Sequence, residues 1–179
     1  MRYWSCHWQY RYWKHEINPE DRPLKSCGSN SFTKRGVLKD DRIYVVSLSD
    51  GQLYLGGRMT VDGIVLRDEA VRRLKNSDLY DADEWAIGSE ETGTPLNLHR
   101  RLSPEISRQL RFISADPARE ALRFVSETHL DNQTTRGVRE LTVQSAALLD
   151  SIIDGTDRVA RSGHLITVME DLLHGADVP

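Results

Sequence analysis

The sequence predicts an α+β fold, in which a small, strongly curved mixed sheet carries helices around its outside. Two observations lead to this prediction. Residues 1–126 are dominated by segments that alternate apolar and polar side chains, as strands do, and the end of the chain is dominated by amphipathic helical segments. We therefore expect a barrel-like domain over residues 1–126, with a polar loop and C-terminal helices over residues 127–179 packed on it.

The strands follow from period-two alternation and from one turn. Residues 2–8 place Trp4, Cys6 and Trp8 on one face. Residues 43–48 and 53–61 form a predicted hairpin, because Asp50-Gly51 between apolar runs favours a two-residue turn with positive φ. Gly56-Gly57 within the return strand predicts a bend or bulge, which is how small sheets close into barrels. Further strands are expected over residues 96–102, 111–114 and 122–126.

The helices follow from capping residues and apolar stripes. Asp68 begins a predicted helix over residues 68–75, and Ser103-Pro104 begins a short one over residues 104–110. Thr142 caps an amphipathic helix over residues 142–154, and a second C-terminal helix is expected over residues 164–174. Residues 16–30 and 127–141 are predicted loops.

Composition limits the class of protein. The chain has 179 residues, of which 39% are hydrophobic, so it can bury a core without the help of disulfides or structural metal ions. It has no apolar run of the ~20 residues that cross a bilayer and no apolar signal segment, so we expect no membrane partner and a cytoplasmic location. Cys6 and Cys27 are then expected to be free thiols. The six histidines show no ligand spacing, so neither a metal nor a cofactor is expected.

Charge and aromatic residues are unevenly distributed. Residues 1–75 carry a formal net charge of +5 and residues 76–179 carry −8. This division allows nucleic-acid contact at the front of the chain, although it is also compatible with ordinary surface charge. Six aromatic residues lie in the first 13 positions: Tyr3, Trp4, Trp8, Tyr10, Tyr12 and Trp13. The first of these fit a strand that fills a core, whereas Tyr10, Tyr12 and Trp13 follow the strand among polar neighbours.

Four segments together resemble a known family. They are the opening Tyr3-Trp4 strand, the loop Ser29-Asn-Ser-Phe32, the segment Lys39-Asp-Asp-Arg-Ile-Tyr44, and the paired strand with Gly56-Gly57. Together they resemble the EVE-like branch of the PUA-like superfamily over about residues 1–65, except that Asp40 stands where the family usually has glycine. The resemblance implies a PUA-like pseudo-barrel with a pocket on one side. Its SRA and YTH relatives accept a flipped, modified base between aromatic walls, and some relatives belong to defence systems.

The resemblance, together with the residue types, suggests a reader of a modified base in DNA or RNA. Such a pocket needs aromatic faces for stacking and fixed polar groups for the base edge. The candidate ligand-binding residues are Trp8, Tyr10, Tyr12, Trp13, Ser29, Asn30, Ser31, Phe32, Asp131 and Asn132. The candidate contacts to the nucleic-acid backbone are Lys34, Arg35, Arg58 and Arg136.

Two other functions stay open. ASCH relatives include hydrolases of acylated nucleosides, so one alternative is an ASCH-like hydrolase of modified nucleosides or RNA. Thr33 and Lys34 with Glu69 or Glu84 are candidates for such chemistry, although no motif identifies a catalytic residue. Alternatively, the amphipathic helices over residues 142–154 and 164–174 could join two copies of the chain as a homodimer.

Overall fold

A computed structural model describes residues 1–9, 22–89, 91–97 and 99–155. Met1–Ala146 form one compact unit, and Ala147–Pro179 form a second. The helix that follows Thr142 covers residues 143–155, and in its part within the second unit Leu149 and Ile153 are buried. The predictions for Tyr10, Tyr12, Trp13 and the helix over residues 164–174 lie outside the described residues.

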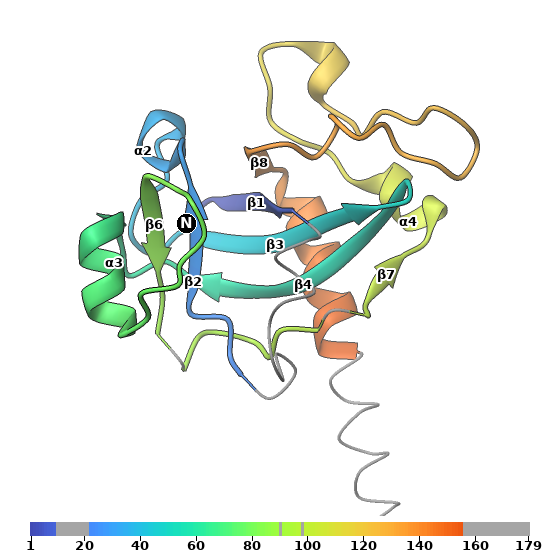
Figure 1. Cartoon of the computed structure of the whole chain (residues 1–179). Coiled ribbons are helices and arrows are strands. Elements are labelled where there is room, and N and C mark those ends of the chain that lie inside the picture. The colour runs from blue at the N-terminus through green and yellow to red at the C-terminus, as the bar shows by residue number, and fades with distance from the viewer. Residues whose placement is uncertain (10–21, 90, 98, 156–179) are drawn as a thin grey trace, which may run out of the picture. The chain divides into compact units, whose positions relative to one another are not determined.

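The larger sheet is mixed and has five strands in the order β7-β4-β3-β1-β8 (Figure 1). The strands are β1 (Tyr3–Trp8), β3 (Arg42–Ser49), β4 (Gln52–Thr60), β7 (Arg101–Leu102) and β8 (Val138–Leu141). β1 runs parallel to β3 and antiparallel to β8. The predicted opening strand is therefore confirmed, and it lies inside the sheet, between two partners.

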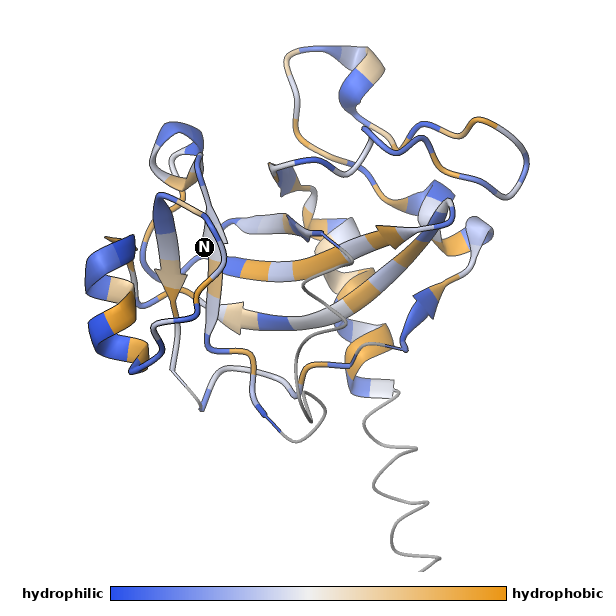
Figure 2. Ribbon diagram, in the orientation of Figure 1, coloured by the Kyte–Doolittle hydropathy of each residue, from blue (hydrophilic) through white to orange (hydrophobic). Residues whose placement is uncertain are grey.

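The predicted hairpin is confirmed in its turn and in its bend. Asp50 and Gly51 have φ values of 50° and 70°, so both turn positions are left-handed as the sequence requires. Val45 pairs with Gly57, whereas the next residue, Val46, pairs with Leu55, so Gly56 is the extra residue of a bulge. Figure 2 shows that hydrophobic residues recur along the ribbons of β3 and β4, and the buried ones, among them Ile43, Val45 and Leu55, belong to the core.

A separate antiparallel sheet has three strands in the order β2-β6-β5. They are β2 (Ser26–Ser29), β5 (Gly63–Leu66) and β6 (Glu84–Ile87). The two sheets do not close into a barrel, so the α+β class is confirmed and the pseudo-barrel is not. The loop prediction was wrong at residues 26–29, where Cys27 and Gly28 are buried between neighbouring elements.

Four short helices occur in the described residues, and the sequence predicts the ones that begin at Arg67 and Pro104 but not the ones that begin at Phe32 and Pro117. They are α2 (Phe32–Arg35), α3 (Arg67–Leu74), α4 (Pro104–Gln109) and the one-turn η2 (Pro117–Arg119). Ser103 caps α4 by accepting a hydrogen bond from the Ile106 amide, as its sequence position predicts. Thr142 Oγ1 likewise accepts from the Ser145 amide at 3.2 Å at the start of the 143–155 helix.

The later strand predictions were too generous. The segment 96–102 is a strand only at its last two residues, and residues 111–114 and 122–126 form isolated bridges rather than strands. The predicted polar loop over residues 127–141 in turn ends in β8, whose Val138 and Leu141 are buried. Residues 112 and 113 instead pair with β8 at the edge of the larger sheet, where Phe112 bridges Leu141 and Ile113 N donates to Glu140 O.

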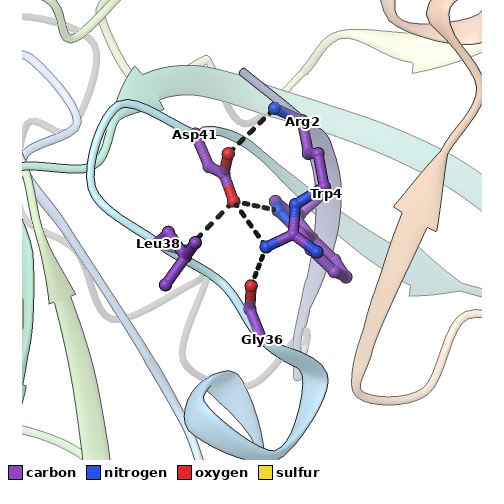
Figure 3. Close-up of polar contacts among 5 residues, drawn as sticks. All are labelled: Arg2, Trp4, Gly36, Leu38 and Asp41. Atoms are coloured by element: carbon purple, nitrogen blue, oxygen red, sulfur yellow. Dashed lines mark hydrogen bonds and ion pairs between the residues drawn. The ribbon is translucent and has the colours of Figure 1, made fainter.

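A buried carboxylate fixes the start of the chain (Figure 3). Asp41 is 4% exposed and accepts hydrogen bonds from Arg2 N at 2.8 Å, Trp4 Nε1 at 2.9 Å and Leu38 N at 3.0 Å. The Arg2 guanidinium lies 3.5 Å from the same carboxylate and also donates to Gly36 O. Burial alone would raise the pKa of Asp41, but these donors and the Arg2 charge outweigh it and lower the pKa.

Candidate functional site

An aromatic pocket lies at the end of β1. Its aromatic walls are Trp8 at the end of β1, Tyr80 after α3, and Trp85 on β6, and its volume is about 710 Å³. The Trp8 and Tyr80 rings meet edge to face with centroids 6.1 Å apart, and the Tyr80 and Trp85 centroids are 4.7 Å apart. We refer to this cavity as the aromatic pocket.

Hydrogen bonds fix the walls of the aromatic pocket. The Tyr80 hydroxyl accepts from Gly28 N at 2.6 Å and donates to Gly28 O at 2.7 Å, and Trp8 Nε1 donates to Cys27 Sγ at 3.1 Å. Burial and the neighbouring thiols raise the pKa of Tyr80, so the phenol is neutral at physiological pH. Trp8 is 8% and Trp85 2% exposed, so Tyr80, which is half-buried, offers the most accessible ring of the three.

Beneath these walls lies a pair of buried thiols. Cys27 Sγ donates to Cys6 Sγ at 2.7 Å, and both cysteines are free. The hydrogen bond with Cys27, followed by burial, raises the pKa of Cys6 well above its ordinary value, so this thiol stays protonated and is a poor nucleophile. Within the described part of the chain, no group of three potential metal ligands occurs.

The rim of the aromatic pocket is basic. Among the residues that the structure describes, Arg22, Lys25 and Lys75 line it and are exposed, against one lining carboxylate, Asp78. Asn76 adds an amide to the same lining. Aromatic and apolar walls suit a flat, partly polar ring, and the amide and cationic groups at the opening suit negative charge attached to that ring.

The predicted polar contacts Ser29, Asn30 and Ser31 and the neighbouring Phe32 lie elsewhere. Phe32 is fully buried in the core, and Asn30 Oδ1 accepts from Asp83 N at 2.9 Å. The Ser29 and Ser31 hydroxyls lie 3.2 Å apart. The Asn30 contact connects the segment before α2 to the segment before β6. None of these four residues lines the aromatic pocket.

Asp131 and Asn132 are not brought to the aromatic pocket. Asp131 pairs with Arg123 at 2.9 Å and accepts from Gln133 N at 2.7 Å, and these two contacts lower the pKa of Asp131. Asn132 instead lines a cavity of about 770 Å³ together with His7 and Arg136. His7 is half-buried there, and burial together with the Arg136 charge lowers its pKa to about 4, so its ring is neutral at pH 7.

The four predicted backbone contacts are spread over the molecule. Lys34 and Arg35 are exposed on α2, and Arg58 lies on β4, where its amide donates to Thr94 Oγ1 at 2.9 Å. Arg136 is exposed directly before β8. Arg119 and Arg139 were not predicted from the sequence, yet they line one cavity with Arg35 and another with Arg136. Burial, followed by the charges of Arg119 and Arg35, lowers the pKa of Arg139.

The candidate catalytic residues are only partly assembled. Glu84 Oε2 accepts a hydrogen bond from Thr33 N at 2.9 Å, so the carboxylate binds the backbone amide of Thr33 and not its hydroxyl. Glu69 instead pairs with Arg72 and Arg73 on α3. This arrangement gives the Thr33 hydroxyl no hydrogen-bonded base among the described residues.

The described residues contain no helix both long and apolar enough to cross a membrane. No family model matches the chain, and no curated protein or solved structure matches it significantly.

Proposed function

We propose that this chain is a nucleic-acid-binding module that accepts a modified base in the aromatic pocket. The observation that carries the proposal is the pocket itself, whose walls are Trp8, Tyr80 and Trp85 beneath a rim of basic side chains. The resemblance of residues 1–65 to EVE-like domains, whose relatives accept flipped bases, agrees with it. Trp8, predicted as a stacking residue, lines this pocket.

Each part of the pocket has a chemical role in the proposal. A base that enters can stack on the half-buried ring of Tyr80, and such stacking contributes about 1–3 kcal/mol per base. This offsets the few kcal/mol needed to take a base out of a duplex. Arg22 and Lys75 at the rim are placed to meet the phosphates that flank the flipped nucleotide. A modified base would be chosen by how its added group fits the apolar wall formed by Leu24 and Leu96.

The test compares two substitutions at one position. Tyr80→Phe and Tyr80→Leu both remove the hydroxyl and its bonds to Gly28, but only Tyr80→Leu removes the ring. Binding is measured with oligonucleotides that are identical except for one methylated or hydroxymethylated base, as duplexes and as single strands. We expect the wild type and Tyr80→Phe to prefer a modified base, and Tyr80→Leu to lose the preference. Equal binding of the wild type to modified and plain oligonucleotides would remove the proposal.

The homodimer through the C-terminal helices stays a prediction, because the second of these helices lies outside the described residues. It can be checked by measuring the mass of the full chain in solution over a range of concentrations.

A further inference from the structure

Two adjoining cavities lie beside β8, and both are lined by arginines. The first has a volume of about 370 Å³ and includes Arg35, Arg119 and Arg139 in its lining. The second has a volume of about 280 Å³, and we call it the arginine cavity. The charged residues in its lining, taken over the described part of the chain, are Arg119, Arg123, Arg136 and Arg139, without a carboxylate. Arg119 and Arg139 line both cavities, so the two cavities form one continuous surface that shares these two arginines.

Most of these arginines lack a carboxylate partner. Arg123 pairs with Asp131 at 2.9 Å. For Arg35, Arg119 and Arg136, all of them exposed, no ion pair occurs within the ranges that the structure describes. They come from α2, η2 and the segment before β8, so the fold brings together cations that are far apart in sequence. Like charges that converge without counterions repel each other, and a bound anion relieves this repulsion.

Arg139 is the fixed centre of the surface. Its guanidinium lies over the Phe112 ring, 3.5 Å from the centroid, and donates to Thr134 O and Arg119 O. These bonds use two of its five N–H donors and hold the plane of the group in place. Burial, followed by the charges of Arg119 and Arg35, lowers the pKa of Arg139 to about 10, so it stays charged at pH 7 although its surroundings disfavour the charge.

The acidic residues lie on the other side of the shared wall. Asp116 and Glu140 line the first cavity, and the Asp116 carboxylate is engaged as the cap of η2, where it accepts from Ala118 N at 3.0 Å. No described residue in the lining of the arginine cavity is acidic. An anion would therefore be held most strongly in the arginine cavity and at the two shared arginines, where planar guanidinium groups suit the bidentate binding of phosphate oxygens.

We propose that the arginine cavity binds a phosphate group, and that Arg119, Arg136 and Arg139 are its main ligands. A further phosphate of the same ligand would reach Arg35 in the first cavity. The phosphates have two possible sources, the backbone of a nucleic acid and a free polyphosphate such as a nucleotide. In the first case this inference rests on the proposed function, and this surface supplies affinity whereas the aromatic pocket supplies the choice of base.

The experiment uses the full chain and two probes, inorganic tripolyphosphate and a short plain oligonucleotide. The variants Arg119→Gln and Arg136→Gln remove exposed side chains that form no hydrogen bond or ion pair with any described residue, so folding should be unchanged, and thermal melting verifies this. Arg101→Gln is the matched control, because Arg101 is also exposed but lies on β7, the opposite edge strand of the same sheet. Binding is measured by calorimetry for tripolyphosphate and by fluorescence anisotropy for the oligonucleotide, at several salt concentrations.

We expect each of the two variants to weaken binding about tenfold or more, because hydrogen bonds from charged donors are the strong ones. For the oligonucleotide, the slope of log K against log salt should fall in magnitude by about 1 per variant, as expected for one lost phosphate contact. Loss of binding to both probes means that a free polyphosphate suffices, and loss of binding to the oligonucleotide alone means that the ligand is the polymer. If both variants bind both probes as Arg101→Gln does, the phosphate site is refuted, whether or not the aromatic pocket distinguishes modified bases.

Discussion

Replacing Asp41 by asparagine should strongly destabilise the fold. The carboxylate of Asp41 is buried and accepts three N–H donors, from the Arg2 amide, the Trp4 indole and the Leu38 amide, with the Arg2 guanidinium beside it. An asparagine side chain has one accepting oxygen and one donating NH2 group, so at least one of these donors would face another donor. The substitution also removes the negative charge that pairs with Arg2.

The expected loss follows from the bonds that are broken. A hydrogen bond to a charged group contributes about 1.5–3 kcal/mol, and a buried donor left without a partner costs about 1–3 kcal/mol. We therefore expect Asp41→Asn to lower the free energy of unfolding by about 3 kcal/mol. In a chain of this length that corresponds to a fall in Tm of roughly 6–12 °C, since 1 kcal/mol shifts Tm by about 2–4 °C. Circular dichroism during heating measures it.

The neighbouring residue provides the control. Asp40 is exposed and has a φ of 68°, a conformation that asparagine tolerates well, so Asp40→Asn should change stability by no more than about 0.5 kcal/mol. Asp41 has a lowered pKa in the folded chain, so its charge stabilises the fold above the ordinary pKa of 3.8 and loses this effect as pH falls through the folded pKa. The gap in Tm between the wild type and Asp41→Asn should thus be constant near neutral pH and narrow in acid. Equal melting of the Asp40 and Asp41 variants at pH 7 would refute the reasoning.

Two further predictions concern other buried contacts. Gly28→Ala should destabilise the chain by roughly 1–3 kcal/mol, because an added Cβ would lie 2.9 Å from the Trp85 ring, whereas Gly63→Ala, with open space around its Cβ, should not; chemical denaturation compares the two. His7 should titrate near pH 4 by NMR, and Arg136→Gln should raise that pKa; a His7 that titrates at 6.5 would contradict the structure. Because the folded pKa of His7 is the lower one, unfolding takes up a proton and stability falls as pH drops from 6.5 to about 4.

The hairpin and two of the three helix caps could be predicted because their causes are local, whereas Asp68 lies in the first turn of α3, whose cap position is Leu66. Asp50-Gly51 specifies its own turn, and Ser103 and Thr142 each bond to an amide three residues further on. Gly56 likewise marks its bulge within one strand pair. In each case the residues that determine the conformation are neighbours in the sequence.

Four strands were not predicted from the sequence: β2, β5, β6 and β8. Each has four residues and depends on a partner that is distant in the sequence. β2 has the sequence Ser-Cys-Gly-Ser, which has low strand propensity, and it is held by pairing with β6 and by the hydroxyl of Tyr80 at Gly28. β8 follows a polar segment and is a strand because β1 lies open to it. Pairing across such separations leaves no periodic signal in four residues.

The candidate sites show the same division. Trp8 was predicted as a wall, but Tyr80 and Trp85 reach it from more than 70 residues away and carry no motif. Arg35 and Arg136 were predicted as phosphate contacts, and the structure shows Arg119 and Arg139 beside them. Nothing in the sequence around Arg119 distinguishes it from an ordinary surface arginine, because its neighbours in space are set by the folding of two polar loops.

The first arginine-lined cavity and the aromatic pocket lie at different positions along β1. Trp4 lines the first arginine-lined cavity and Trp8 lines the aromatic pocket, and these side chains lie on the same face of β1, about 13 Å apart at the usual rise per residue. Buried indole hydrogen bonds, to Asp41 and to Cys27, fix both walls. Contacts this far apart contribute additively to binding. Arg119→Gln should therefore weaken binding to modified and plain oligonucleotides by the same factor. Tyr80→Leu should instead remove the difference in affinity between modified and plain oligonucleotides. Unequal factors for Arg119→Gln would mean that the phosphate and base contacts are coupled.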